Sequence, residues 1–211
     1  MDFDLNEEQR MWQKAVHDFV AAEVQPKAHE TDETGEFNWP AVRKMGPLGM
    51  LGLNIPEEYG GSGVDAVSAA IAIEELGWAC GSTALAIAAH NGLGTTPIVL
   101  YGSDELKQKW LPMVASGKGK LGSLALTEPG AGSDVVAARS TARREGDEYV
   151  LNGEKMWISL ADTADNFLSF CWTDEEKRRK RDHSGMSCFI VERTMKGFTS
   201  GTIHGKLGIR A

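Results

Sequence analysis

The chain has 211 residues, of which 42% are hydrophobic, so it can bury the core of one large domain or of two small ones. Its net charge is −8, and acidic residues outnumber basic ones mainly before residue 120, which argues against a nucleic-acid-binding protein that must neutralise phosphates. No apolar run reaches the roughly 18 residues of a membrane span, so we expect no membrane-spanning helix.

The first half of the sequence has the pattern of a helical domain. Asn6 is a favourable N-cap with Gln9 as its capping-box partner, and apolar side chains then recur every three or four residues. Pro26 is expected to end this first helix, because proline cannot continue it. A second helix is predicted to start near Trp39, which precedes a proline suited to a first helical turn, and Asp65 is expected to cap a third.

Three more helices are predicted before residue 120. Residues 82–93 are small or apolar on all faces, which is typical of a helix buried between others, and Asn91-Gly92 is expected to end it. Pro97 is expected to open a short helix. Ser103 is expected to cap the last one, which Pro112 then bends or ends.

From residue 121 the pattern changes to short strands and turns. The predicted strands cover residues 121–126, 140–144, 148–151, 167–172, 186–191 and 197–203. A turn is predicted at residues 145–147, and Asn152-Gly153 is the strongest short hairpin signal in the chain. We therefore expect an α+β protein with an all-helical domain at residues 1–120, a linker at residues 117–119 and a β domain at residues 121–211.

Cysteines, histidines and charged residues give no sign of a metal site or of secretion. The three cysteines and five histidines are widely scattered, so we expect no metal centre and a reducing compartment such as the cytoplasm. The acidic N-terminus lacks the basic and apolar stretches of a secretory signal. The basic run at residues 177–181, which has acidic neighbours, is interpreted as a solvated loop between strands.

Residues 124–134 form the most informative stretch of the β half. A short apolar run leads into a threonine, a glutamate, a Pro-Gly turn and a final Ser-Asp. Gly130 and Gly132 let the backbone bend sharply and approach a ligand closely, and successive N–H groups in such a turn can bind an anion. From spacing alone, a strand followed by an ordinary surface turn is equally favoured.

Three segments, in sequence order, resemble the acyl-CoA dehydrogenase family. They are residues 124–134, residues 152–159 with the pattern Asn-Gly-Glu-Lys-Met-Trp-Ile-Ser, and residues 206–211. Weaker matches at residues 55–61 and 101–112 extend the resemblance over the whole chain. The resemblance implies an N-terminal helical domain followed by a β-barrel-like or β-sandwich middle domain, which is incomplete, with the family's C-terminal helical bundle absent from this sequence.

The resemblance also implies FAD as the cofactor. Thr127 is similar to the threonine that bonds the pyrimidine edge of the flavin, Trp157 to the tryptophan that packs on its ring, and Ser159 to a threonine near its reactive nitrogen. Ser133 resembles the serine near the FAD pyrophosphate and the pantetheine of the substrate. The expected cofactor-binding residues are Leu124, Leu126, Thr127, Gly132, Ser133, Trp157, Ile158 and Ser159, and Ser133 is also the expected substrate-binding residue.

Taken alone, the same residues have ordinary structural interpretations. Thr127 suits a strand, Ser133 suits a turn that bonds its own backbone, and Trp157 suits a hydrophobic core. The sequence also departs from the family pattern at Leu124, where many members have an aromatic residue, and at Leu160, where asparagine is common. The change at Leu124 affects a side-chain contact with the flavin. The change at Leu160 affects how tightly the turn beside the flavin is held.

By the same resemblance, the parent enzyme oxidises an acyl-CoA between its α and β carbons, with the hydride passing to FAD and the electrons then to an electron-transfer flavoprotein. The α proton needs a carboxylate base within hydrogen-bond reach, and in the family this base lies beyond Ala211. Glu128 and Asp134 are interpreted as structural acids of the turn. We therefore assign no catalytic residue, and we expect the chain alone to be inactive.

Other activities fit the same motifs. A flavin-dependent acyl-CoA oxidase or monooxygenase would share them, and a non-catalytic binding or assembly module could have kept the scaffold. The resemblance further implies a homo-oligomer, a tetramer or a dimer, in the cytoplasm or in the mitochondrial matrix of a eukaryote. The alternative interpretation of the basic run at residues 177–181 is a contact with a phosphate of CoA.

Overall fold

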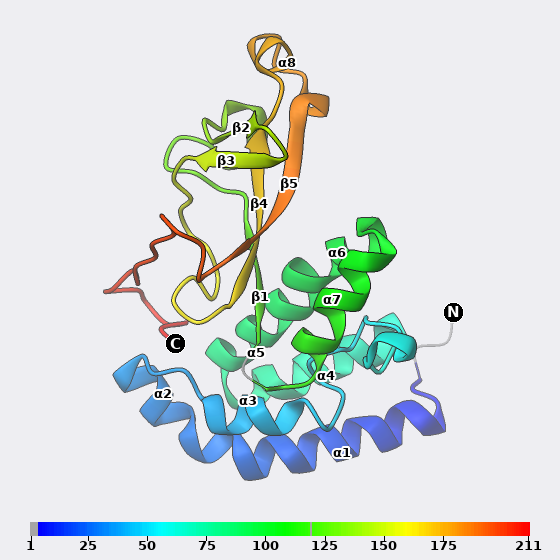
Figure 1. The fold of residues 1–211 in the computed structure, drawn as a ribbon. Coiled ribbons are helices and arrows are strands. Elements are labelled where there is room, and N and C mark those ends of the chain that lie inside the picture. The colour runs from blue at the N-terminus through cyan, green and yellow to red at the C-terminus, as the bar shows by residue number, and fades with distance from the viewer. Residues whose placement is uncertain (1–3, 119) are drawn as a thin grey trace. The chain divides into compact units, whose positions relative to one another are not determined.

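The computed structural model describes residues 4–118 and 120–211 (Figure 1). The chain forms two compact units: a helical unit comprising Met1–Leu121 and Gly201–Ala211, and a β unit comprising Gly122–Ser200. The last residues of the chain, expected in the β domain, therefore group with the helical unit. The expected linker at residues 117–119 includes residue 119, which lies outside the described residues.

The helical unit packs its helices around an apolar core. Its α-helices are α1 (Glu7–Glu23), α2 (Ala28–Thr34), α3 (Trp39–Met45), α4 (Ala66–Ala79), α5 (Gly81–Ala88), α6 (Thr96–Tyr101) and α7 (Asp104–Ala115). Fully buried side chains in this core include Val20, Met45, Leu51, Leu76, Ile87 and Leu111. Each such side chain contributes roughly 1.5–3 kcal/mol relative to exposure, so the core holds the helices together. No helix in the described chain is long and apolar enough to cross a membrane.

The predicted helix starts are confirmed by their capping bonds. At α1, Asn6 Oδ1 accepts the Gln9 N–H at 2.8 Å and Gln9 Oε1 accepts the Asn6 N–H at 3.2 Å, which completes the capping box. The Asp65 carboxylate caps α4, and the Ser103 hydroxyl caps α7. The first helix ends at Glu23, shortly before Pro26.

The prediction that Asn91-Gly92 ends a helix is wrong. After α5 the chain continues as a π-helix, Ala89–Thr95. Asn91 is buried, and its amide accepts the Leu53 N–H and donates to the Met50 carbonyl, both at 2.9 Å. The amide also donates to the Ile87 carbonyl, one turn back in the helix, at 3.0 Å, so its bonds support a continuing helical backbone and no local turn forms.

Pro112 does not end α7, because it lies inside the helix, which runs on to Ala115. A proline in this position removes one intrahelical hydrogen bond. Leu111, Val114 and Ala115 are buried around it. Burial of these side chains offsets the lost bond and holds the last turn.

The C-terminal segment lies against the helical unit at two points. Arg210 pairs with Asp32, with Nη1 3.7 Å from the carboxylate and 3.4 Å from the backbone carbonyl of the same residue. Ile209 lies so close to Gly81 that a Cβ added to this glycine would be 3.3 Å from the Ile209 Cδ1 atom. The segments around Asp32 and Gly81 therefore pack against Ile209 and Arg210.

The β unit is built on one mixed sheet. Its elements are β1 (Gly122–Ala125), β2 (Thr141–Glu145), β3 (Glu148–Asn152), β4 (Asn166–Trp172), α8 (Glu175–Arg179) and β5 (Met186–Glu192). The strand order is β1-β4-β2-β3, and β5 also pairs with β4. The central strand β4 runs parallel to β1 and antiparallel to β5, and it meets β2 at Thr141↔Trp172. The expected order of a helical domain followed by a β domain is confirmed.

Asn152-Gly153 does not form the predicted hairpin. The hairpin turn is the one between β2 and β3, where Gly146 has φ +65°. Gly153 instead lies against Ser140, because an added Cβ would be 2.5 Å from the Ser140 Cβ and 2.7 Å from its Cα. The glycine therefore allows a close approach of two segments and does not make a turn.

Two other predictions for the β half are also wrong. Residues 197–203 contain no strand. The basic run does not form a loop: its first residues belong to the short helix α8, which Asp174 caps by accepting the N–H groups of Glu176 and Lys177 at 2.9 and 3.0 Å. The local cap makes this segment helical, and its basic side chains are mostly exposed.

Candidate cofactor-binding site

The candidate site is built around the loop at residues 126–140, which joins β1 to β2. The loop turns tightly, since the Glu128 N–H donates to the Ala131 carbonyl at 2.9 Å and the Ala131 N–H donates back at 3.1 Å. A Cβ added at Gly130 or Gly132 would meet no atom within 4 Å. Open space beside two glycines lets a ligand reach the backbone of this turn.

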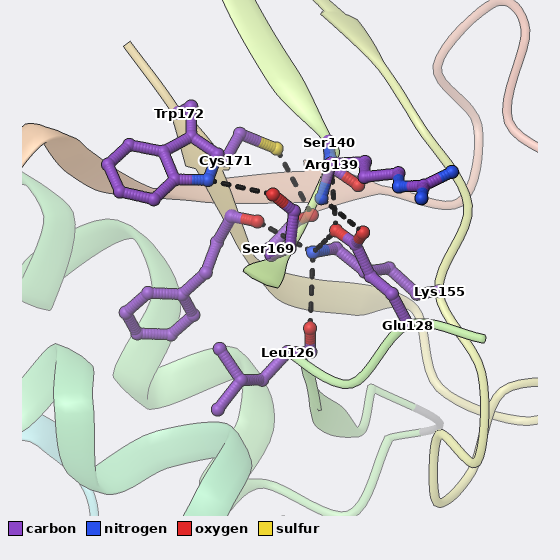
Figure 2. A network of polar contacts seen from close by, with 10 residues as sticks. Leu126, Glu128, Arg139, Ser140, Lys155, Ser169, Cys171 and Trp172 are labelled. Carbon is purple, nitrogen blue, oxygen red and sulfur yellow. Dashed lines mark hydrogen bonds and ion pairs between the residues drawn. The ribbon is translucent and has the colours of Figure 1, made fainter. Parts of the chain in front are cut away.

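Glu128 closes the base of the loop with a buried carboxylate. One of its oxygens accepts the Arg139 N–H at 2.5 Å, and the other accepts the Ser140 N–H at 3.0 Å (Figure 2). The side chain is only 6% exposed. These bonds join the third residue of the loop to the last residues before β2. They therefore fix the two ends of the loop to each other.

Lys155 connects this loop to the sheet. Its ammonium donates to the Glu128 carboxylate at 2.8 Å, to the Phe170 carbonyl of β4 at 2.7 Å and to the Leu126 carbonyl at 3.2 Å (Figure 2). An ammonium group has three donors, and here each has an acceptor. The side chain is 12% exposed, so the ion pair is largely screened from water.

The electrostatics of Glu128 fix its charge. Burial by itself raises the pKa of the carboxyl, but the hydrogen bonds from Lys155, Ser140 and Arg139 outweigh burial and lower the pKa from 4.5 to about 2. The carboxylate therefore stays ionised at neutral pH. A group with so low a pKa is a poor proton acceptor, which favours its interpretation as a structural acid.

A second segment, residues 156–159, lies beside the start of the loop. The Met156 N–H donates to the Thr127 carbonyl at 2.8 Å, and the Ser123 hydroxyl donates to the Ser159 carbonyl at 2.5 Å. Trp157 follows Met156 directly, with φ +60° and 61% of its surface exposed. The alternative interpretation of Trp157 as a core residue on a strand is therefore wrong.

Arg193 holds the chain that follows Trp157. Its guanidinium donates to the carbonyls of Ala161 and Ala164, both at 2.7 Å. The same group lies over the rings of Phe167 and Phe198, 5.5 and 5.7 Å from their centroids. These contacts anchor the loop at residues 157–165 on β4 and on the segment after β5.

The structure brings some of the expected site residues together and leaves others apart. Thr127 and the segment containing Trp157, Ile158 and Ser159 are adjacent through the Met156 hydrogen bond. The half-buried Leu124 pairs with Leu168 in the sheet, and Leu126 contributes its carbonyl to Lys155.

Gly132 and Ser133 lie in the exposed part of the turn. Among the described residues, Ser133 makes no hydrogen bond to the segment that contains Trp157. Its neighbour Asp134 pairs with Arg181 at 2.5 Å, which fixes this end of the turn to the segment after α8. This ion pair favours the interpretation of Asp134 as a structural acid of the turn.

The arrangement suits a planar, partly apolar ring with polar edges. An exposed indole offers a face for stacking, and the same two segments carry the hydroxyls of the half-buried Thr127 and Ser159. The glycine turn offers backbone N–H groups for an anion. These donors and this aromatic surface fit a flavin dinucleotide. Across the described residues, no group of three or more His, Cys, Asp or Glu side chains could hold a metal ion.

Lys155 and Arg193 were not among the residues expected at the site. Lys155 is the one basic residue in the two motifs at residues 124–134 and 152–159, and Glu128 lies in the first of them, so a lone base beside three acids was the available signal. Arg193 carried no signal, since it lies outside every motif and its partners are backbone carbonyls about 30 positions away.

Comparison with known families agrees with both halves of the chain. The family model described as acyl-CoA dehydrogenase, N-terminal domain, matches residues 6–118. The model described as acyl-CoA dehydrogenase, middle domain, matches residues 123–211. The two matches follow each other in order and leave only a few residues uncovered.

Individual relatives show the same likeness. A short-chain specific acyl-CoA dehydrogenase of Clostridium acetobutylicum is 44% identical over 211 residues, which cover all of this chain and 54% of the relative. The solved butyryl-CoA dehydrogenase from Megasphaera elsdenii has a TM-score of 0.91 at 34% identity. The match covers 100% of this chain and 55% of the Megasphaera elsdenii chain. An acyl-CoA dehydrogenase from Bacillus anthracis, solved in complex with FAD, has a TM-score of 0.87 at 40% identity, covering 98% of this chain and 35% of that one. The chain spans about half the length of the curated relatives it matches.

Proposed function

The chain belongs to the acyl-CoA dehydrogenase family, and from this premise we propose that its β unit binds FAD for the oxidation of an acyl-CoA. One observation carries the proposal. The Met156 N–H bonds the Thr127 carbonyl at 2.8 Å, which sets a loop rich in N–H and hydroxyl groups beside an exposed tryptophan. The FAD complex of the Bacillus anthracis relative supports the choice of cofactor.

The residues of the site have distinct roles in this proposal. Thr127 bonds the pyrimidine edge of the flavin, the indole of Trp157 packs on its ring, and Ser159 offers a hydroxyl near its reactive nitrogen. When FAD is bound, it supplies the acceptor for the hydride that leaves the β carbon of the acyl-CoA. Ser133 and the N–H groups around Gly132 bind the pyrophosphate, and Ser133 also bonds the pantetheine of the substrate.

The two acids of the loop hold the backbone and do not remove the α proton. Glu128 is ionised, buried and bonded by Lys155, and its pKa of about 2 disfavours proton uptake. Asp134 is committed to Arg181 at the surface. The base for the α proton is therefore neither of these carboxylates.

The whole protein is proposed to take an acyl-CoA as substrate and an electron-transfer flavoprotein as electron acceptor. Acyl-CoA names recur among the relatives of this chain, including a short-chain specific enzyme and a butyryl-CoA dehydrogenase. We further propose that it works as a homotetramer or dimer in the cytoplasm, or in the mitochondrial matrix of a eukaryote.

FAD titration of the purified chain tests the proposal. We expect saturable quenching of flavin fluorescence, and binding about tenfold weaker in Trp157→Ala, because a stacked aromatic ring is lost. Tyr149→Ala, which removes an exposed aromatic ring on β3, is the matched control and should bind like the wild type. Absence of saturable binding by the wild-type chain contradicts the proposal.

The reaction itself is tested with the whole protein. Anaerobic addition of an acyl-CoA should bleach the bound flavin, and an electron-transfer flavoprotein should then restore its colour. Rapid hydrogen peroxide production in air would instead assign an acyl-CoA oxidase. A whole protein that does not retain FAD would point to a non-catalytic module.

A further inference from the structure

The backbone of Thr127 is held on both sides by one dipeptide, Lys155-Met156. The peptide before Thr127 contains the Leu126 carbonyl, which accepts from the Lys155 ammonium at 3.2 Å. The peptide after Thr127 contains its own carbonyl, which accepts from the Met156 N–H at 2.8 Å. Both peptide planes around one Cα are thereby fixed, so the backbone dihedral angles of Thr127 have little freedom.

The bond to Leu126 also sets the direction of the Thr127 N–H. All described peptide bonds are trans, and in a trans peptide the carbonyl and the N–H point to opposite sides. The Leu126 carbonyl points toward the buried ammonium of Lys155, so the Thr127 N–H points away from it. A positive charge on the carbonyl side also polarises the peptide and strengthens the N–H as a donor.

Lys155 is itself held in a rigid setting. Its ammonium is anchored on the Phe170 carbonyl, which belongs to the central strand β4, at 2.7 Å. Glu128 neutralises its charge at 2.8 Å and is in turn bonded by two backbone N–H groups near β2. Lys155 therefore fixes the Leu126–Thr127 peptide relative to strand β4 of the sheet (Figure 2).

We infer that Lys155 is a positioning residue for the flavin. It orients the Leu126–Thr127 peptide so that the Thr127 N–H is presented, in a fixed direction and with enhanced donor strength, to the acceptor edge of the flavin ring. Lys155 acts through the backbone and does not touch the cofactor. The inference rests on the proposed binding of FAD by the β unit.

The test separates positioning from folding with a paired substitution. Lys155→Met alone leaves the Glu128 carboxylate buried without its cation. This destabilises the fold whether or not Lys155 positions the flavin. The double variant Glu128→Gln/Lys155→Met removes both charges, and replacing a buried ion pair by neutral groups of similar size is often tolerated. Lys196→Met, at an exposed lysine after β5, is the matched control.

Three quantities are measured on each protein: the urea midpoint, the dissociation constant for FAD and the reduction potential of the bound flavin. We expect the double variant to fold with a lower midpoint, because the Leu126 and Phe170 carbonyls lose their donor, and to bind FAD about tenfold more weakly under conditions in which both proteins are folded. Its potential should move to a more negative value, because a donor that stabilises charge on the reduced ring is misplaced. Lys196→Met should match the wild type in all three.

Each outcome decides the inference. A double variant with wild-type affinity and potential overturns it and leaves the proposed binding of FAD intact. A wild-type chain that does not bind FAD overturns both. Amide exchange in the wild-type chain is a second measurement that needs no variant: FAD should slow exchange of the Thr127 N–H, and unchanged exchange at this amide overturns the inference.

Discussion

Replacement of Glu128 by glutamine probes the buried ion pair through the pH dependence of stability. The substitution keeps the size of the side chain and one oxygen for the backbone N–H groups, but it removes the charge opposite Lys155. In the folded chain, burial raises the pKa of Glu128, but hydrogen bonds led by that from Lys155 lower it further, from 4.5 to about 2. A difference of this size corresponds to about 3 kcal/mol of the free energy of unfolding.

The direction of the effect follows from the sign of the pKa difference. Because the folded pKa is lower than the unfolded one, the stabilisation is complete above about pH 4.5 and is lost as the pH falls from there toward about 2. Glu128→Gln should therefore be about 3 kcal/mol less stable at neutral pH, with Lys155 left without its carboxylate. Its free energy of unfolding should also fall less than that of the wild type as the pH is lowered, because the variant has no carboxylate at position 128 to protonate.

Urea unfolding at a series of pH values from neutral to about 2.5 measures this difference. The NMR signal of the indole N–H of the buried Trp172, which donates to the Ala138 carbonyl at 2.9 Å, reports on the β unit separately from the other tryptophans of the chain. Glu145→Gln removes an exposed carboxylate at the end of β2 and should change the stability by less than about 0.5 kcal/mol. Parallel pH profiles for Glu128→Gln and the wild type would refute the reasoning, because the ion pair would then contribute nothing specific.

Three further substitutions test other parts of the structure. Gly153→Ala should destabilise the β unit by about 2 kcal/mol or more in urea unfolding, because its Cβ would overlap Ser140, whereas Gly130→Ala has open space and should change the stability little. Asn91→Ala should destabilise the helical unit by about 2–3 kcal/mol in thermal unfolding, since buried backbone groups lose their partners; a loss below about 0.5 kcal/mol would contradict this role. Trp157→Gly should leave the unfolding free energy within about 1 kcal/mol of the wild type, because the residue is exposed at φ +60°, yet weaken FAD binding; a large loss of stability would show a structural role instead.

Helix starts could be predicted from the sequence, whereas the features that depend on distant contacts could not. The caps at Asn6, Asp65 and Ser103 use partners within three residues, so local sequence determines them. Asn91, which precedes a glycine, was predicted to end a helix. Its hydrogen bond with Leu53 could not be predicted, because Leu53 lies 38 positions away in the sequence. Gly153 looked like a turn residue because its close approach to Ser140 depends on the folded sheet.

The candidate site shows the same division. Thr127 and Trp157 came from the family resemblance, and the structure places their segments next to each other; their contacts with a cofactor stay a prediction. The supporting residue Lys155 has partners at positions 126, 128 and 170, a set that spacing and periodicity do not reveal. Sequence patterns thus identify exposed functional groups more easily than the buried ones that orient them.

The return of the chain to the helical unit has a consequence for how the protein is made. Because Gly201–Ala211 groups with Met1–Leu121, the β unit is an insertion within the helical unit. During synthesis the contact of Arg210 with Asp32 cannot form until the whole β unit has left the ribosome, so this contact of the helical unit is made after the β unit has had time to fold. A backbone cut inside the β unit would separate the two parts of the helical unit in the covalent chain, and they would then depend on packing alone to stay associated.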